Sequence, residues 1–188
     1  TEAVELVIQA LRGLEHAQYA HAAVNGALDR ATPDVVLVQG DTTTAAIAAL
    51  AAFYRRIPVG HIEAGLRTND PENPFPEEIN RRLADVVARY RFAPTRASAD
   101  ALRAEGCPAR SIHVTGNTVV DALKFMLAQG GPAEAPAARP GETLVVVTSH
   151  RREAFGEPLR RICRALLEVA ARRPDVRFVY PVHLNPNV

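Results

Sequence analysis

The stretch DVVLVQGDTTTAAIAALAAFYRRIPVG, residues 34–60, decides the fold of this 188-residue chain. Its first five residues form an apolar run without alternation, which is typical of a strand buried on both faces. A polar turn, QGDTTT, follows, and the alanine-rich segment from about Thr43 to Arg55 favours a helix. The next strand is expected at IPVG, residues 57–60. This order predicts a βαβ unit with parallel strands.

The same alternation of apolar strands and helices continues along the chain, which predicts an α/β fold with parallel sheets covered on both faces. Residues 1–33 are expected to be helical throughout. Pro76 stands at or just before the first turn of a helix over 77–89. Further strands are expected at 90–93, 112–115, 143–147 and 177–181, and further helices after Thr95 or Ser98, at 119–129 and at 159–172.

The segment GGPAEAPAARPG, residues 130–141, is rich in Gly, Pro and Ala and predicts a linker. It divides the chain into an expected N-terminal lobe, residues 1–129, and the start of a C-terminal lobe, residues 142–188. The chain begins with Thr rather than Met and ends on VHLNPNV. We therefore expect both lobes to be incomplete and both ends to be cut from a longer protein.

Composition excludes several classes of partner. A net charge of +1 provides no field strong enough to attract nucleic acid or an anionic membrane surface. No apolar run approaches the roughly 20 residues that a membrane span needs. Cys107 and Cys163 lack CxxC spacing, which favours reduced thiols in an intracellular protein. We expect a cytoplasmic protein.

Ligands of open parallel sheets bind beyond the carboxyl ends of the strands, so the loops that follow the strands are the place to look for a site. Two of these loops carry acids, and each acid has a structural alternative. Asp41 in QGDTTT is either a helix N-cap or an acid–base group, and the threonines of this turn are also plausible caps. Glu63 in HIEAGLR is either an i,i+4 salt-bridge partner of Arg67 or a catalytic carboxylate. His61 is expected to be a packed histidine.

PEEINRR places Glu77 and Glu78 in the first turn of a helix, where the helix dipole favours ionised carboxylates. Arg81 lies four residues after Glu77, so the two either form a salt bridge or both face a ligand. In SHRRE, His150, Arg151 and Arg152 lie between a strand and a helix, as in an anion site that suits a diphosphate. Otherwise, SHRRE is a basic exposed turn.

Acids and a basic anion-binding turn at one end of a sheet indicate proton transfer with departure of a phosphate group. A metal site from Asp41, His61, Glu63 and His150 lacks the His spacing of zinc motifs, so no metal is expected. These residues do not identify the substrate.

Longer motifs resemble one family. VVLVQGDTTTA, FYRRIPVGHIEAGLRT, PFPEEINRRL, FAPT, HVTGNTVVDAL, VTSHRREAFG and YPVHLNPNV are similar to segments of the bacterial non-hydrolysing UDP-N-acetylglucosamine 2-epimerases, in family order. The resemblance runs from about Pro33 to Val188 and is poor over residues 1–32.

The resemblance implies two Rossmann-like lobes of the glycosyltransferase-B type. It implies C2 epimerisation between UDP-GlcNAc and UDP-ManNAc by elimination of UDP to 2-acetamidoglucal and re-addition, without a cofactor. The product would feed cell-surface polysaccharide synthesis, and the full-length protein would be a homodimer. By motif, the resemblance implies catalytic Asp41, Glu63 and Glu77, UDP-binding Arg81 and His150, and an effector site at Arg151 and His183.

Two family segments are absent from the chain: a GTRPE-like start and a later SGG-like segment. We therefore expect the 188 residues alone to be inactive. Three other functions remain open: a hydrolysing epimerase that releases ManNAc and UDP, a UDP-sugar glycosyltransferase, and a non-catalytic nucleotide-sugar binding protein. The acids argue against the last function, because binding alone does not need them.

Overall fold

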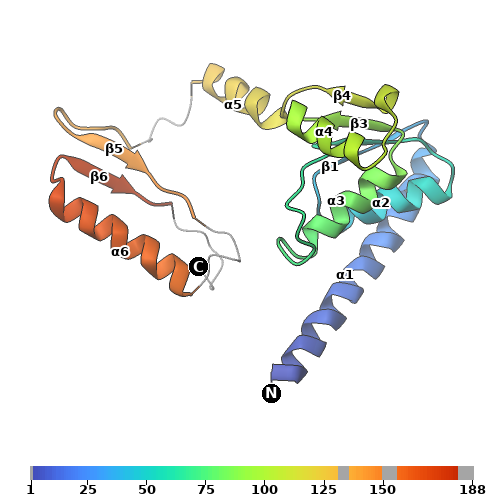
Figure 1. Cartoon of the computed structure of the whole chain (residues 1–188), viewed down its shortest axis with the longest axis horizontal. Helices are drawn as coiled ribbons and strands as arrows, with labels where there is room; N and C mark the ends of the chain where they lie inside the picture. Colours follow the sequence, from blue (N-terminus) through green and yellow to red (C-terminus); the bar gives the residue numbers. More distant parts are fainter. Residues whose placement is uncertain (1, 131–135, 150–155, 182–188) are drawn as a thin grey trace. The chain divides into compact units, whose positions relative to one another are not determined.

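The computed structural model describes residues 2–130, 136–149 and 156–181, with side chains from residue 17 onward. The chain divides into two compact units, Thr1–Lys124 and Phe125–Val188 (Figure 1). The first unit contains α1 (Glu2–Ala31), β1 (Val36–Gln39), α2 (Thr43–Tyr54), β2 (Val59–Ile62), α3 (Glu77–Val87), β3 (Tyr90–Ala93), α4 (Arg96–Ala104), η1 (Ala109–Ser111), β4 (Ile112–Val114) and the start of α5 (Thr118–Ala128).

The sheet of the first unit has the order β1-β2-β3-β4, and every neighbouring pair is parallel. Val38 pairs with His61, His61 pairs with Arg91, and Ala93 pairs with Val114. The strands therefore end side by side, and the loops after β1, β2 and β4 start from the same edge. The predicted parallel α/β sheet is confirmed.

Small side chains let α2 and α3 pack closely on one face of this sheet. Ala45, Ala49 and Ala52 of α2 join Val38, Val59, Ala84 and Ala88 in one core cluster. A second cluster joins Ala64 and Ala93 to Ala99, Leu102 and Ile112, which fixes α4. Thr95 begins α4 as expected, since its Oγ1 accepts from Ser98 N at 3.1 Å.

Two predictions about the first strands are wrong. Leu37 is 60% exposed, so β1 is buried on one face only, because α2 and α3 cover the face that carries Val38. The second strand begins at Val59 rather than at Ile57. The amide of Ile57 is already used, since it donates to Ala52 O at the end of α2, and Pro58 has no amide to donate.

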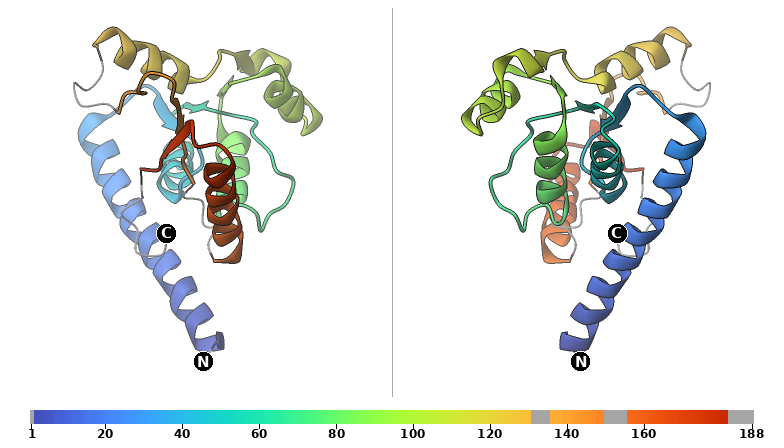
Figure 2. Two further views of the ribbon diagram at one scale, coloured as in Figure 1. Left: turned by 90° about the vertical axis from the view of Figure 1, so that its left-hand side faces the viewer. Right: turned by 90° about the vertical axis from the view of Figure 1, so that its right-hand side faces the viewer.

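The helix α1 packs against α2 through its C-terminal part. Leu28 is buried, and Asp29 accepts a 2.6 Å hydrogen bond from Arg55 at the end of α2. The N-terminal half of α1 extends past the other elements of this unit (Figure 2). The predicted N-terminal helix is confirmed. Within the described residues, no helix has both the length and the apolar character required to cross a membrane.

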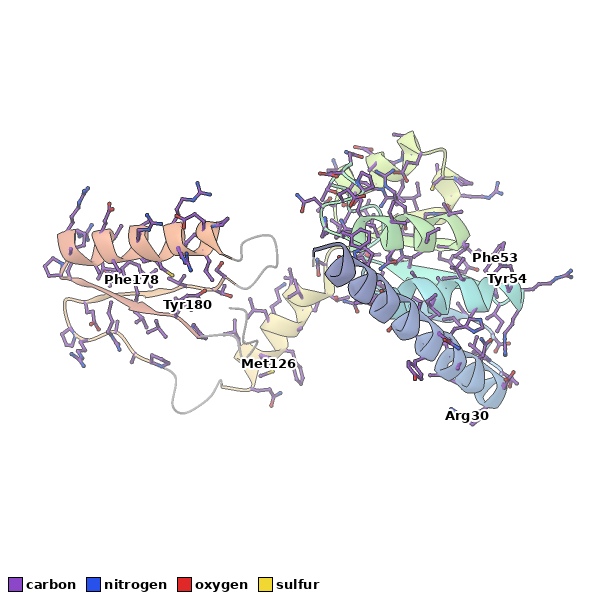
Figure 3. The ribbon with its side chains drawn as sticks, turned by 90° about the horizontal axis from the view of Figure 1, so that it is seen from below. Arg30, Phe53, Tyr54, Met126, Phe178 and Tyr180 are labelled. Carbon is purple, nitrogen blue, oxygen red and sulfur yellow. The ribbon has the colours of Figure 1, made fainter. Side chains whose placement is uncertain are left out.

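The second unit contains the parallel pair β5 (Thr143–Val146) and β6 (Val176–Val179), joined through α6 (Glu157–Arg172). Phe178 of β6 lies beneath α6 (Figure 3), where it lines an apolar groove with Cys163 and Leu166. Arg177 pairs with Glu142 at 3.0 Å, and Tyr180 donates to Ser149 O at 2.8 Å. This unit is one βαβ repeat, as its sequence pattern predicts.

Candidate active site at the carboxyl ends of the first sheet

Asp41 lies two residues after the end of β1 and is not the N-cap of α2. The cap is Thr42, whose Oγ1 accepts from Ala45 N at 3.2 Å, so the N-cap interpretation of Asp41 is wrong. Gly40, with φ of +72°, turns the chain before Asp41, a conformation that favours glycine. The carboxylate of Asp41 accepts a hydrogen bond from Arg81, and its backbone carbonyl accepts from Asn80. Both partners belong to α3, which therefore holds the turn after β1.

Glu63 follows β2 and has a left-handed backbone, with φ of +69°. This conformation is uncommon for a residue with a side chain and costs about 1–2 kcal/mol. The amide of Gln39 donates to Glu63 Oε1 at 3.1 Å and also to Thr118 Oγ1 at 3.1 Å. The other carboxylate oxygen, Oε2, lies 3.8 Å from the position that a Cβ on Gly40 would take. Glu63 thus lies against the turn that precedes Asp41.

Arg67 does not pair with Glu63, so the predicted i,i+4 salt bridge is wrong. The left-handed Glu63 prevents the helical turn that would bring the two side chains together. Arg67 instead forms a fork with Glu105, at 2.7 and 2.6 Å, and contacts Asp85 at 2.9 Å. Burial alone would lower the pKa of Arg67, but Glu105 and Asp85 outweigh it and raise that pKa. Glu63 is therefore not needed to neutralise Arg67.

The first turn of α3 contains Glu77, which is half-buried, and Glu78, which is fully buried. Glu78 accepts from the backbone amides of Thr68 and Asn69, at 3.1 and 3.2 Å, and from Arg82 at 3.0 Å. Burial would raise the pKa of Glu78, but the Thr68 amide and Arg82 outweigh it, so the pKa is lowered. The structural role of Glu78 was not predicted from the sequence, although the paired glutamates were a visible signal of it.

Arg81 bridges Asp41 and Glu78, with a 3.4 Å contact to the latter. The predicted bridge from Glu77 to Arg81 is wrong, because Arg81 points to these two carboxylates instead. Its Nε is buried and has no hydrogen-bond partner among the described residues. A buried donor without a partner is costly, and a ligand that accepted from it would recover that cost.

His61 is fully buried beneath the two acid-bearing turns. Its Nδ1 lies 2.7 Å from Asp85 Oδ1, and its Nε2 lies 2.9 Å from Gly40 O. The second carboxylate oxygen of Asp85 accepts from Gly65 N at 3.1 Å. Gly65 has φ of +82°, and a Cβ there would lie 2.2 Å from Ser98 O, so only glycine fits this turn. The expected packed histidine is confirmed, and it is hydrogen-bonded on both sides, to Asp85 and to Gly40 O.

Three predicted site residues, His150, Arg151 and His183, lie outside the described residues. Of the predicted site, the structure thus brings Asp41, Glu63 and Arg81 together with the first turn of α3. In the described part of the chain, no cluster of three His, Cys, Asp or Glu side chains could hold a metal ion.

Rossmann-like α/β proteins bind ligands beyond the carboxyl ends of their parallel strands, and this sheet has Asp41, Glu63 and Arg81 at that edge. The family model "UDP-N-acetylglucosamine 2-epimerase" matches residues 16–188. A Salmonella typhimurium UDP-N-acetylglucosamine 2-epimerase is 52% identical over 165 residues, which is 83% of this chain and 44% of that protein. A putative UDP-N-acetylglucosamine 2-epimerase of Thermotoga maritima is 52% identical over 160 residues, which is 83% of this chain and 42% of that protein.

Solved structures give the same result. The UDP-GlcNAc 2-epimerase of Neisseria meningitidis bound to UDP-GlcNAc matches with a TM-score of 0.86 and 42% identity over 94% of this chain and 50% of that one. The structure of S. aureus MnaA with UDP matches with a TM-score of 0.88 and 38% identity, over 93% of this chain and 48% of that one. The chain belongs to the UDP-N-acetylglucosamine 2-epimerase family. It spans about half the length of these relatives, and the α/β fold class of the glycosyltransferase-B type is confirmed.

Proposed function

We propose that the full-length protein carrying this chain interconverts UDP-GlcNAc and UDP-ManNAc by inverting C2 of the sugar. Family membership supports this activity, and two structural neighbours are described as bound to UDP-GlcNAc or UDP. The epimerisation is non-hydrolysing and supplies a nucleotide sugar for cell-surface polysaccharide. Because the chain spans about half of its relatives, we expect the 188 residues alone to form no UDP-ManNAc.

The proposed reaction eliminates UDP and adds it back. A carboxylate takes the C2 proton, the C–H electron pair forms the C1–C2 double bond, and the C1–O bond breaks with its electrons on UDP. Re-addition of UDP to 2-acetamidoglucal, with a proton delivered to the opposite face of C2, gives the epimer. We assign the proton transfers to Asp41, Glu63 and Glu77, because general acids and bases must lie within reach of the reacting carbon.

UDP carries charge that must be stabilised when it leaves. We assign Arg81 and His150 to this role, and Arg151 and His183 to an effector nucleotide sugar. The unpartnered Nε of Arg81 supports its assignment, because a phosphate oxygen would accept from that donor.

The observation that carries the proposal is the backbone of Glu63. Strained residues persist where the surrounding structure holds them, and they cluster at active sites. Glu63 is such a residue, at the carboxyl end of a central strand and beside the turn of Asp41. A carboxylate that served only to stabilise the fold would gain nothing from this conformation.

Incubation of the full-length protein with UDP-GlcNAc in deuterated water tests the proposal. We expect deuterium at C2 of both UDP-sugars and no free ManNAc. Free ManNAc with UDP would instead indicate a hydrolysing epimerase, and retention of the C2 proton would contradict epimerisation. Glu63→Gln is expected to abolish exchange while UDP binding persists, and a mutant with normal exchange would refute the assignment of Glu63.

A further inference from the structure

The acid-bearing turns meet at one buried pair of side chains, His61 and Asp85. His61 is 0% exposed and Asp85 is 1% exposed. Through Nε2, His61 contacts the carbonyl of Gly40, the residue before Asp41. Through Oδ2, Asp85 accepts from the amide of Gly65, two residues after Glu63.

Asp85 also belongs to α3, the helix whose first turn carries Glu77. The pair therefore connects all three elements that bear the proposed catalytic acids: the turn after β1, the turn after β2 and α3. We infer that His61 and Asp85 form a buried ion pair that positions these acids for proton transfer. This role rests on the proposed function, and it assigns to two buried residues the positioning of the acids rather than contact with the substrate.

The hydrogen-bond geometry fits a charged pair. A carbonyl oxygen can only accept, so Nε2 of His61 carries a proton toward Gly40 O at 2.9 Å. An ionised carboxylate also only accepts, so Nδ1 carries a proton toward Asp85 at 2.7 Å. Both ring nitrogens are donors only in the imidazolium form. The pair is therefore a cation and an anion.

The surroundings keep Asp85 ionised. Burial would raise the pKa of Asp85, but the hydrogen bond from His61 and the charges of His61 and Arg67 outweigh burial and lower that pKa. Arg67 is in turn neutralised by Glu105. On the other side, Arg91 donates to the backbone carbonyl of Asp85 through Nε and Nη2. Asp85 is thus fixed through its side chain and its backbone, which suits a residue that sets the position of others.

The first variant, His61→Phe, keeps the volume of the ring and removes both hydrogen bonds. We expect kcat of the full-length protein to fall roughly 10- to 100-fold, since small displacements of catalytic groups have effects of this size. KM should change little, because the backbones of the turns after β1 and β2 have no proposed role in binding UDP. Ser98→Ala is the matched control: Ser98 is also buried and hydrogen-bonded, but its Oγ pairs with Thr95 Oγ1 at 2.9 Å, at the start of α4. Its kcat should equal that of the unmodified protein.

The second variant, Asp85→Asn, tests the charge without relying on the reaction. An asparagine amide can donate to a neutral His61 while its oxygen still accepts from Gly65. In nitrogen NMR of histidine-labelled protein at neutral pH, we expect two protonated ring nitrogens at His61 in the unmodified protein and one in Asp85→Asn. A neutral His61 in the unmodified protein would overturn the ion pair, whether or not His61→Phe folds.

The two failures can be told apart. An unmodified protein that leaves the C2 proton in place contradicts the proposed function. An active unmodified protein together with a folded, fully active His61→Phe variant contradicts the positioning role. A kcat loss in His61→Phe, with the control unaffected, supports the inference.

Discussion

The side-chain amide of Gln39 donates a 3.1 Å hydrogen bond to Oε1 of Glu63. The two residues lie at the ends of neighbouring parallel strands, 24 positions apart in the chain. Because an amide donor stabilises and orients an ionised carboxylate, Gln39 holds Glu63 in one rotamer.

Gln39→Leu should therefore lower kcat about tenfold, by freeing the Glu63 carboxylate to rotate away from C2. Leucine is close in size, so the strand should be preserved. Steady-state kinetics of the full-length protein would measure the change. Thr118→Val is the comparison, because it removes the other acceptor of Gln39 and leaves the bond to Glu63. A Gln39→Leu variant no slower than Thr118→Val would show that Glu63 does not depend on Gln39.

The left-handed backbone of Glu63 predicts a conflict between stability and activity. Glu63→Gly and Glu63→Gln should both abolish turnover, but only glycine adopts φ of +69° without strain. Glu63→Gly should therefore be the more stable of the two by about 1 kcal/mol, measured by urea denaturation.

Arg56→Gly is the control for this experiment. Arg56 also has a positive φ, of 61°. It is exposed and follows α2, and it is not one of the proposed catalytic or UDP-binding residues. We expect the same gain in the free energy of unfolding with no loss of turnover. Equal stabilities of Glu63→Gly and Glu63→Gln, alongside a stabilised Arg56→Gly, would show that Glu63 stores no strain.

Much of the fold could be predicted from the sequence, because apolar strands and helical periods are local patterns. The strand Tyr90–Ala93 has the predicted bounds, and α2 begins at the predicted Thr43. The exposed face of β1 was not predictable from its apolar run, since exposure depends on which helices cover the sheet. Likewise, the start of β2 depends on the hydrogen bond from Ile57 to Ala52, which belongs to the preceding helix.

Local patterns singled out Asp41, Glu63 and Arg81, which the structure brings together, but they did not give the pairings of these side chains. Spacing rules suggested Glu63 with Arg67 and Glu77 with Arg81. The structure instead pairs Arg67 with Glu105 and Arg81 with Asp41. These pairs are separated by 38 and 40 positions and form only when distant elements meet. Local rules could not reveal the network of His61 and Asp85 for the same reason.

Glu78 ties the loop after β2 to α3, so its loss should loosen that loop. In the unmodified protein, the two carboxylate oxygens of Glu78 accept hydrogen bonds from the backbone N–H groups of Thr68 and Asn69 and from the side chain of Arg82. Glu78→Gln replaces one of these oxygens with an NH2 group, which cannot accept. We expect a loss of about 2–4 kcal/mol in the free energy of unfolding, because a buried donor is left without a partner. Limited proteolysis should also cut residues 66–76 faster.

Glu72→Gln is the matched control, because it makes the same chemical change at an exposed position of the same loop. Its free energy of unfolding should stay within about 0.5 kcal/mol of the unmodified protein. If the two variants unfolded alike, the buried contacts of Glu78 would not stabilise the loop.

The buried carboxylates also predict how stability responds to acid. Asp85 and Glu78 have pKa values below their ordinary 3.8 and 4.5, because hydrogen bonds and positive charges outweigh burial. Their stabilising contribution is therefore complete above the ordinary values and is lost as pH falls through the lower folded values, where the unfolded chain binds more protons. Urea denaturation at a series of pH values should show the free energy of unfolding decreasing from about pH 4.5 downward.

Asp85→Asn should make this decrease shallower, since one of the groups that takes up a proton on unfolding is gone. The same slope in both proteins would mean that Asp85 is ionised equally easily in the folded and unfolded chain, and the buried ion pair with His61 could not then be what stabilises its charge.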